Sequence, residues 1–123
     1  GKAGVPRCLG SFRKGVSAYS CKPTKGQQWF VDGLGRMVHY RTSKCLTLNP
    51  KSRTVGVKRC GTSPRQRWWS DSAGRLRAEA SQEYCLERRP AGRARWPASV
   101  SMEWCSGKKT QRWGFPVDLP GMR

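Results

Sequence analysis

The chain has 123 residues, with 25 Lys and Arg against 7 Asp and Glu, six Cys, six Trp and one His, and its formal net charge is +18. This length allows one domain, and an aromatic content of 10% argues against a disordered chain. No apolar run approaches the ~18 residues that a membrane span needs, so we expect no membrane insertion by this chain.

Acid–base and metal-binding groups are scarce. A secreted ribonuclease of this size and charge would need two imidazoles or equivalents, and His39 stands alone. No cluster of His, Cys or acidic residues has metal-ligand spacing. We therefore expect no catalysis, no metal and no cofactor.

The cysteines favour disulfides. Six is an even count in a short chain, which is typical of a disulfide framework and an oxidising compartment. A zinc site would need close pairs such as Cys-x2-Cys, and the nearest neighbours here are Cys8 and Cys21.

The chain contains three copies of one pattern. Each copy opens with Cys-Leu, has a second Cys with Val five residues before it, and ends in Gln-x-Trp with the Trp eight residues after that Cys. The opening cysteines are Cys8, Cys45 and Cys85, the second cysteines are Cys21, Cys60 and Cys105, and the tryptophans are Trp29, Trp68 and Trp113. Because these tryptophans repeat, we expect them to be structural core.

The copies predict an all-β fold. Apolar residues alternate with period two before each second cysteine, which indicates strands, and Gly, Pro, Ser and Lys fill the gaps as turns. Each copy of about 40 residues would make about four short strands, and three copies would share one core in a closed domain with pseudo-threefold symmetry. We predict a single domain over 1–115, with repeats of about 1–41, 42–81 and 82–115, and a tail or linker to a further module over 116–123.

The repeat also predicts the disulfide pairing. Each copy holds two cysteines, so the simplest arrangement pairs them within copies. The predicted bonds are Cys8–Cys21, Cys45–Cys60 and Cys85–Cys105.

The third copy lacks an evident closing strand. No Gly-Arg-apolar segment follows Trp113 as it follows the first two tryptophans. Either Val117–Leu119 closes the barrel, which we favour, or Lys2–Val5 does.

These motifs resemble the ricin-type β-trefoil over Cys8 to Phe115. The middle of the chain is similar to the N-terminal cysteine-rich domain of the macrophage mannose receptor family. That likeness rests on Trp29-Phe30, Arg36-Met37-Val38-His39-Tyr40, Ser43-Lys44-Cys45-Leu46-Thr47-Leu48, Val55-Gly56-Val57, Cys60 and Gln66-Arg67-Trp68-Trp69. The resemblance implies an extracellular, non-catalytic module, secreted or in a receptor ectodomain. In at least one family member this module binds sulfated N-acetylgalactosamine sugars.

The resemblance also identifies positions for sugar-binding residues. Sugar-binding ricin-type lobes carry an Asp two residues after the first Cys, an aromatic residue two before the second, and an Asn before the Gln of Gln-x-Trp. The corresponding residues are Gly10, Thr47 and Glu87; Tyr19, Lys58 and Glu103; and Gly26, Arg65 and Thr110. No lobe carries the trio, so ricin-like galactose recognition is not predicted. Thr110 also replaces the Trp that stacks on the sulfated sugar in the mannose receptor, although Lys108 and Lys109 lie beside it.

Positive charge is spread over all three copies, at net +7, +7 and +4, which favours an anionic partner for the folded surface. The densest cluster lies between the first two predicted strands of the third copy and combines guanidinium forks with a flat ring. Its candidate ligand-binding residues are Arg88, Arg89, Arg93, Arg95 and Trp96. A second group contains Lys51, Arg53, Lys58 and Arg59, and a third contains Arg65 and Arg67.

Three tryptophans do not repeat, namely Trp69, Trp96 and Trp104, and these favour recognition, although Trp104 could instead pack in its own lobe. For His39 a structural role is favoured over pH sensing.

The sequence thus predicts a binding module for an anionic glycan, such as a sulfated or otherwise acidic sugar. Two alternatives stay open: recognition of an acidic protein by a scavenger or Fc-type receptor module, and less specific binding of nucleic acid through charge.

Overall fold

The computed structural model describes residues 7–12, 15–22, 24–89 and 98–113. Its strands and short 3-10 turns run in the order β1 (Arg7–Phe12), β2 (Gly15–Ser20), η1 (Lys25–Gln27), β3 (Trp29–Val31), β4 (Met37–His39), β5 (Cys45–Asn49), β6 (Thr54–Lys58), η2 (Pro64–Gln66), β7 (Trp68–Ser70), β8 (Leu76–Ala78), β9 (Tyr84–Arg88), β10 (Val100–Trp104) and η3 (Lys109–Gln111). No helix within these ranges is long and apolar enough to cross a membrane.

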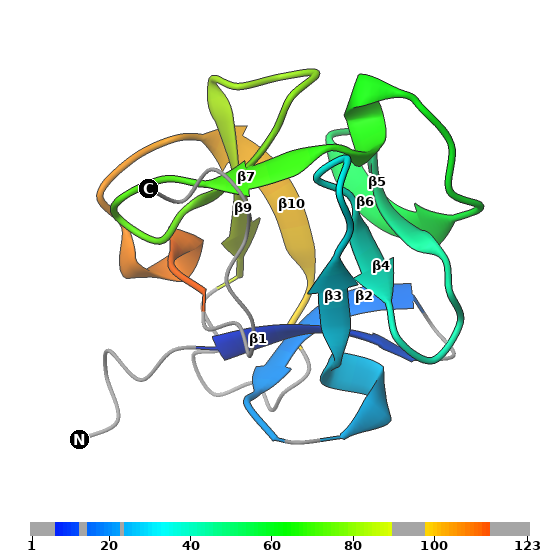
Figure 1. Cartoon of the computed structure of the whole chain (residues 1–123). Coiled ribbons are helices and arrows are strands. Elements are labelled where there is room, and N and C mark those ends of the chain that lie inside the picture. The colour runs from blue at the N-terminus through cyan, green and yellow to red at the C-terminus, as the bar shows by residue number, and fades with distance from the viewer. Residues whose placement is uncertain (1–6, 13–14, 23, 90–97, 114–123) are drawn as a thin grey trace.

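The strands form three lobes around one centre (Figure 1). Lobe 1 holds β1–β4, lobe 2 holds β5–β8, and lobe 3 holds β9, β10 and η3. Each lobe opens with an antiparallel hairpin, β1–β2, β5–β6 or β9–β10. The two segments proposed to close the third copy, Val117–Leu119 and Lys2–Val5, lie outside the described residues, as does the predicted tail 116–123.

Register is the same in all three hairpins. The Leu after the first cysteine faces the small or apolar residue three positions before the second, as the pairs Leu9↔Ala18, Leu46↔Val57 and Leu86↔Met102. Because side chains alternate along a strand, this register turns one apolar set per lobe inward. The register of the hairpins therefore matches the period-two alternation of apolar residues in the sequence.

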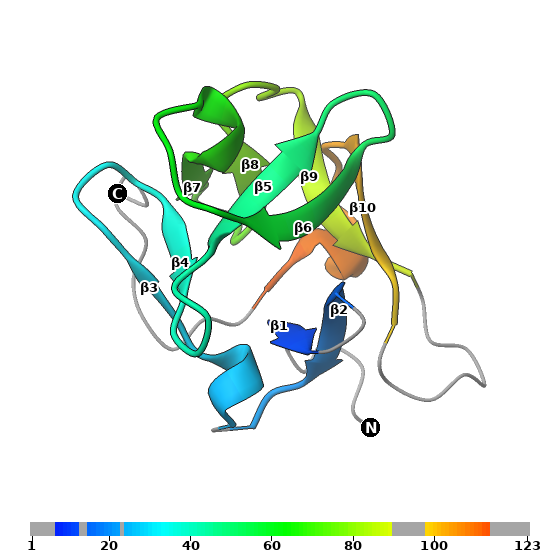
Figure 2. The same cartoon turned by 90° about the vertical axis from the view of Figure 1, so that its right-hand side faces the viewer.

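The second strands of the hairpins meet one another. Ala18 of β2 and Ala98, two residues before β10, exchange two backbone hydrogen bonds of 2.8 and 2.9 Å, and the Met102 N–H of β10 donates over 2.8 Å to the carbonyl of Arg53, the residue before β6. Figure 2 shows β6 and β10 side by side at this junction. The lobes thus share backbone bonds as well as side-chain packing.

The core combines leucines and methionines with the three repeated tryptophans. Trp29, Trp68 and Trp113 are buried, at 3, 2 and 7% exposure, as predicted. Each indole Nε1–H donates to the carbonyl of the Leu that follows the first cysteine of its lobe. These three bonds, to Leu9, Leu46 and Leu86, measure 2.8, 2.9 and 2.9 Å.

The three predicted disulfides, Cys8–Cys21, Cys45–Cys60 and Cys85–Cys105, are present. They close sequence separations of 13, 15 and 20 residues, and a loop of about 15 residues contributes roughly 3 kcal/mol in the chain-entropy model.

A glutamine amide brackets each second cysteine. The Gln27, Gln66 and Gln111 Nε2 groups donate to the carbonyl of the residue before that cysteine, over 3.0, 2.9 and 2.8 Å. Each Oε1 accepts the N–H of the residue after it, over 2.9, 2.7 and 2.8 Å. Backbone groups at the end of each hairpin, where the strand pairing stops, are satisfied in this way.

An Asp–Arg pair ties each of the first two lobes to the next. In lobe 2, Asp71 accepts hydrogen bonds from the Arg75 N–H and Nε, at 3.0 and 2.7 Å, while Arg75 Nη1 reaches the Ser106 carbonyl of lobe 3 over 2.9 Å. Asp32 and Arg36 repeat this arrangement in lobe 1, with Arg36 Nη1 on the Gly61 carbonyl of lobe 2. The turns require Gly35 and Gly74 at φ values of +81° and +83°, which side chains disfavour.

His39 is fully buried and structural, as favoured. Its Nε2 lies 3.0 Å from the Gly26 carbonyl oxygen and its Nδ1 lies 3.1 Å from Thr42 Oγ1. The ring packs edge-on against Trp29, with centroids 4.8 Å apart.

Replacing Trp68 with Phe tests the indole bond. Trp68→Phe keeps most of the apolar volume but leaves the buried Leu46 carbonyl without its donor, so the free energy of unfolding should fall by about 1–3 kcal/mol. Urea denaturation measures this, with Trp69→Phe on the half-buried outer face as the matched control. Equal, small losses in both variants would contradict the structural role of the bond.

Acid titration tests the Asp–Arg tie. Burial raises the pKa of Asp71, but hydrogen bonds from the Arg75 N–H, the Arg77 and Arg75 guanidinium groups and the Ala73 N–H outweigh it and hold that pKa below its ordinary value. A lowered folded-state pKa contributes stability above the unfolded pKa of about 3.9, and this is lost as the pH falls through the folded pKa. The unfolding free energy should therefore drop between about pH 5 and pH 2, and less steeply in Asp71→Asn; parallel curves would refute this.

Candidate functional site

Three positions of each lobe correspond to those that the sequence resemblance identifies for sugar binding. They are the residue two after the first cysteine, the residue two before the second, and the residue before the Gln; we call them the corner positions. In lobe 2, Gln66 Nε2 donates to Thr47 Oγ1 over 2.9 Å, and in lobe 3, Gln111 Nε2 donates to Glu87 Oε1 over 2.8 Å. The amide that holds the fold therefore also orients a corner side chain.

The corner of lobe 1 is filled by aromatic rings. Phe12 and Tyr19 pack edge to face, with centroids 4.8 Å apart. A Cβ at Gly26 would overlap the Phe12 ring, and one at Gly10 would lie 2.9 Å from Tyr19 Cδ2. The two glycines thus leave room for the Phe12 and Tyr19 rings at this corner.

The corner of lobe 2 is basic. Lys58 ends β6 opposite Cys45 and is exposed, and Arg65 is exposed in η2, where its N–H donates to Ser63 Oγ over 3.1 Å. Within the part of the chain that the structure describes, no ion pair involves Lys58 or Arg65. Both charges are exposed and can therefore bind an anion.

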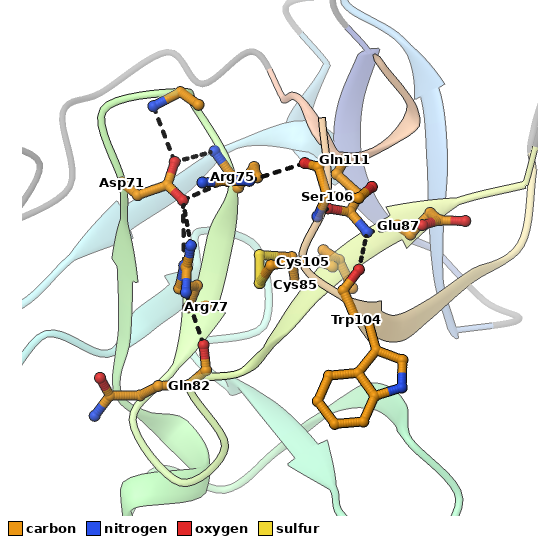
Figure 3. The surroundings of a disulfide bond; sticks show 12 residues. Asp71, Arg75, Arg77, Gln82, Cys85, Glu87, Trp104, Cys105, Ser106 and Gln111 are labelled. Atoms are coloured by element: carbon orange, nitrogen blue, oxygen red, sulfur yellow. Dashed lines mark hydrogen bonds and ion pairs between the residues drawn. A yellow bond between two sulfur atoms is a disulfide. The ribbon is translucent and has the colours of Figure 1, made fainter. Parts of the chain in front are cut away.

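The corner of lobe 3 is acidic. Glu87 is held by Gln111, and Glu103 accepts a 2.8 Å hydrogen bond from Ser101 Oγ. Ser101 pairs with Glu87 across the hairpin, so both carboxylates lie on one face. Figure 3 shows Glu87 beside Gln111, near the Cys85–Cys105 disulfide.

Arg88 corrects the sequence prediction. It was predicted to be a surface ligand for anions, but only 8% of it is exposed. Its guanidinium donates to the Arg112 and Lys109 carbonyls and lies over the Trp113 ring, 5.6 Å from the centroid. Burial lowers the pKa of Arg88, and the charge of Arg7 adds to this.

The other predicted ligand residues fall into separate groups. Arg89 is exposed. Lys58 and Arg59 are exposed at the end of β6, and Lys108 and Lys109 are exposed around the start of η3. Among the described residues, no hydrogen bond or ion pair joins these two lysine-containing groups. The other three predicted residues, Arg93, Arg95 and Trp96, lie outside the residues that the structure describes.

Two structural features were missed from the sequence. The corner of lobe 1 is closed by Phe12, which no alternation pattern predicted. The partners of Arg36 and Arg75 were also missed, although Asp32 and Asp71 stand four residues before them at the same offset. In the described ranges no group of three or more His, Cys, Asp or Glu side chains could hold a metal ion.

Comparison with known proteins identifies the family. The model of the ricin-type β-trefoil lectin domain matches residues 6–113. The chain belongs to this family. The family is one of carbohydrate-binding modules, and the fold prediction of an all-β trefoil with three disulfides is confirmed.

Solved structures with similar folds include several lectins. GalNAc-T7 with UDP, GalNAc and Mn2+ is 20% identical, with a TM-score of 0.71 over 94% of this chain and 21% of that one. The β-trefoil lectin of the Vibrio vulnificus hemolysin/cytolysin, with N-acetyl-D-lactosamine bound, is 20% identical over 89% of this chain and 85% of that one, with a TM-score of 0.71. The C-half of an earthworm R-type lectin with GalNAc is 13% identical over 90% and 82% of the two chains, with a TM-score of 0.63.

At these identities the likeness shows the fold alone, and the chain spans about a fifth of the first of these proteins. No curated protein sequence matches the chain significantly. The narrower likeness to the mannose receptor family remains a prediction.

Neighbouring arginines provide a test of the Arg88 assignment. Arg88→Ala removes two hydrogen bonds from a charged donor and the stacking on Trp113, so it should lower the unfolding free energy by about 2–4 kcal/mol. Arg89→Ala removes the same charge from an exposed position and should change it by less than about 0.5 kcal/mol. Thermal or urea unfolding measures both, and equal stability of the two variants would refute the structural role.

Proposed function

We propose that this chain is an extracellular, non-catalytic glycan-binding module that recognises an acidic sugar through the basic corner of lobe 2. The family supports carbohydrate binding. The observation that carries the acidic specificity is that Lys58 and Arg65 stand where sugar-binding lobes have an aromatic residue and an Asn, with no ion pair of their own among the described residues.

The differences between the lobes select lobe 2. Phe12 and Tyr19 fill the corner of lobe 1, and two carboxylates would repel an anion at the corner of lobe 3. At lobe 2, the Lys58 ammonium group and the Arg65 guanidinium fork can bind a sulfate or carboxylate, whereas the Thr47 hydroxyl already donates to the Cys45 carbonyl over 2.9 Å. Ricin-like galactose recognition would need the Asp that Thr47 replaces.

The proposed location follows from the disulfides. Three disulfides favour an oxidising compartment, which fits an extracellular or receptor-ectodomain location. The arginine-rich segment 88–97 remains a second candidate for anion contact through Arg89, Arg93, Arg95 and Trp96.

A glycan array tests the proposal. The disulfide-intact chain is screened against sulfated, sialylated and neutral glycans at physiological and at raised salt. We expect selective binding of an acidic glycan that weakens about 10- to 100-fold in the double variant Lys58→Ala/Arg65→Ala, because one or two charge-assisted hydrogen bonds are lost.

The matched control is Lys22→Ala/Lys25→Ala, which removes the same charge beside the filled corner of lobe 1. It should change affinity less than about threefold through long-range charge alone, and this effect should vanish with salt. Equal losses in both double variants, or binding of every polyanion including DNA, would overturn the specific site. Binding to an acidic protein with no glycan bound would favour the protein-recognition alternative.

A further inference from the structure

A second surface of lobe 3 carries an exposed aromatic stack outside the corner. Tyr84 and Trp104 are cross-strand partners at the ends of β9 and β10. Their rings lie 4.7 Å apart and 32° from parallel, and Trp104 is 64% exposed. Side chains alternate along β10, so Trp104 lies on the face opposite Glu103, and Figure 3 shows its indole pointing away from Glu87 and Gln111.

The stack continues into lobe 2. The Arg53 guanidinium carbon lies over the Tyr84 ring, 5.5 Å from its centroid. Arg53 has a φ of +57°, a conformation that suits Gly or Asn better than Arg. The Arg53 side chain therefore packs on the Tyr84 ring from a residue whose backbone conformation is disfavoured.

The backbone around the stack is fixed on both sides. The Trp104 carbonyl accepts the Gln111 Nε2–H bond of 2.8 Å, and the next residue, Cys105, is in a disulfide. The Arg53 N–H donates to the Asn49 carbonyl and its own carbonyl accepts from Met102, each over 2.8 Å. An exposed ring held this way loses little freedom when a ligand stacks on it.

We propose that Trp104, backed by Tyr84 and Arg53, is a stacking platform for the apolar C–H face of a neutral pyranose ring. The electron-rich face of an indole attracts the weakly positive C–H groups of a sugar, as it does aromatic edges. A cationic ligand is disfavoured, because Arg53 already lies at the stack and the chain carries +18.

The size of the platform also favours a sugar over a protein. Two aromatic side chains offer at most about 300–500 Å², and Tyr84 is half-buried, whereas a stable protein interface covers about 800 Å² per partner. One hexose ring fits the smaller area. This site shares no residue with the basic corner of lobe 2, so it stands or falls independently of the acidic-glycan proposal.

Binding of neutral glycans to the disulfide-intact chain tests the platform. We expect a neutral glycan on the array, with N-acetyl-D-lactosamine as the solution probe, to bind the wild type and to lose at least about tenfold in affinity in Trp104→Ala. Tyr40→Ala removes an aromatic ring that is 63% exposed and should leave affinity within about twofold. Lys58→Ala/Arg65→Ala should likewise leave neutral binding unchanged.

A second variant keeps the fold intact. Arg53→Gly suits the positive φ and removes only the backing guanidinium, so it should weaken neutral-glycan binding by about threefold without loss of stability. In NMR spectra, the indole N–H signal missing from Trp104→Phe should be the tryptophan signal that shifts most on titration with the probe.

Several outcomes would overturn the platform. They are the absence of neutral-glycan binding, unchanged affinity in Trp104→Ala, or preferential shifts of another indole signal. If acidic-glycan binding still falls in Lys58→Ala/Arg65→Ala, the proposed function stands while the platform fails. Stacking of single-stranded nucleotides in place of sugars would also refute the sugar assignment.

Discussion

The fold depends on a glutamine side chain that bonds the backbone on both sides of a cysteine. Each lobe needs a loop to leave its hairpin at the second cysteine, where the strand ladder ends and backbone groups would otherwise lack partners. The Gln amide supplies one donor and one acceptor there, as Gln66 does for Arg59 and Gly61. The core Trp two residues later then reaches back to the first strand. One short Gln-x-Trp motif thus fixes both the loop and the core.

Because the Gln-x-Trp motif fixes the loop and the core in every lobe, the corner residues can differ between lobes. Gln66 and Gln111 each have a second amide hydrogen, which takes Thr47 Oγ1 in one lobe and Glu87 Oε1 in the other. In lobe 1 the same position is Gly10, and rings cover it. A symmetric scaffold therefore carries one closed, one basic and one acidic corner, and its function must be argued lobe by lobe.

The fold, the core tryptophans and the disulfides could be predicted because their residues recur at the same offsets in all three copies. Contacts that occur in only one lobe could not be predicted in this way. Arg88 was misassigned from its basic neighbours, although it stands two residues after the buried Leu86 and so lies on the inner face of its strand. Alternation would have revealed that. The Tyr84–Trp104 stack needed the register of β9 against β10, and the closure by Phe12 needed the loop geometry, which local pattern does not provide.

The structure also changes what the net charge of +18 means. Arg36 and Arg75 tie lobes together, Arg77 binds Asp71 beneath the Trp69 ring, and Arg88 supports Trp113. These guanidiniums are used by the fold, so total charge overstates what a ligand can reach. Recognition then depends on a few placed groups, an anion-binding corner and a stacking ring. Two weak sites on one rigid module can together hold an extended glycan more tightly than either alone, provided that the glycan spans them.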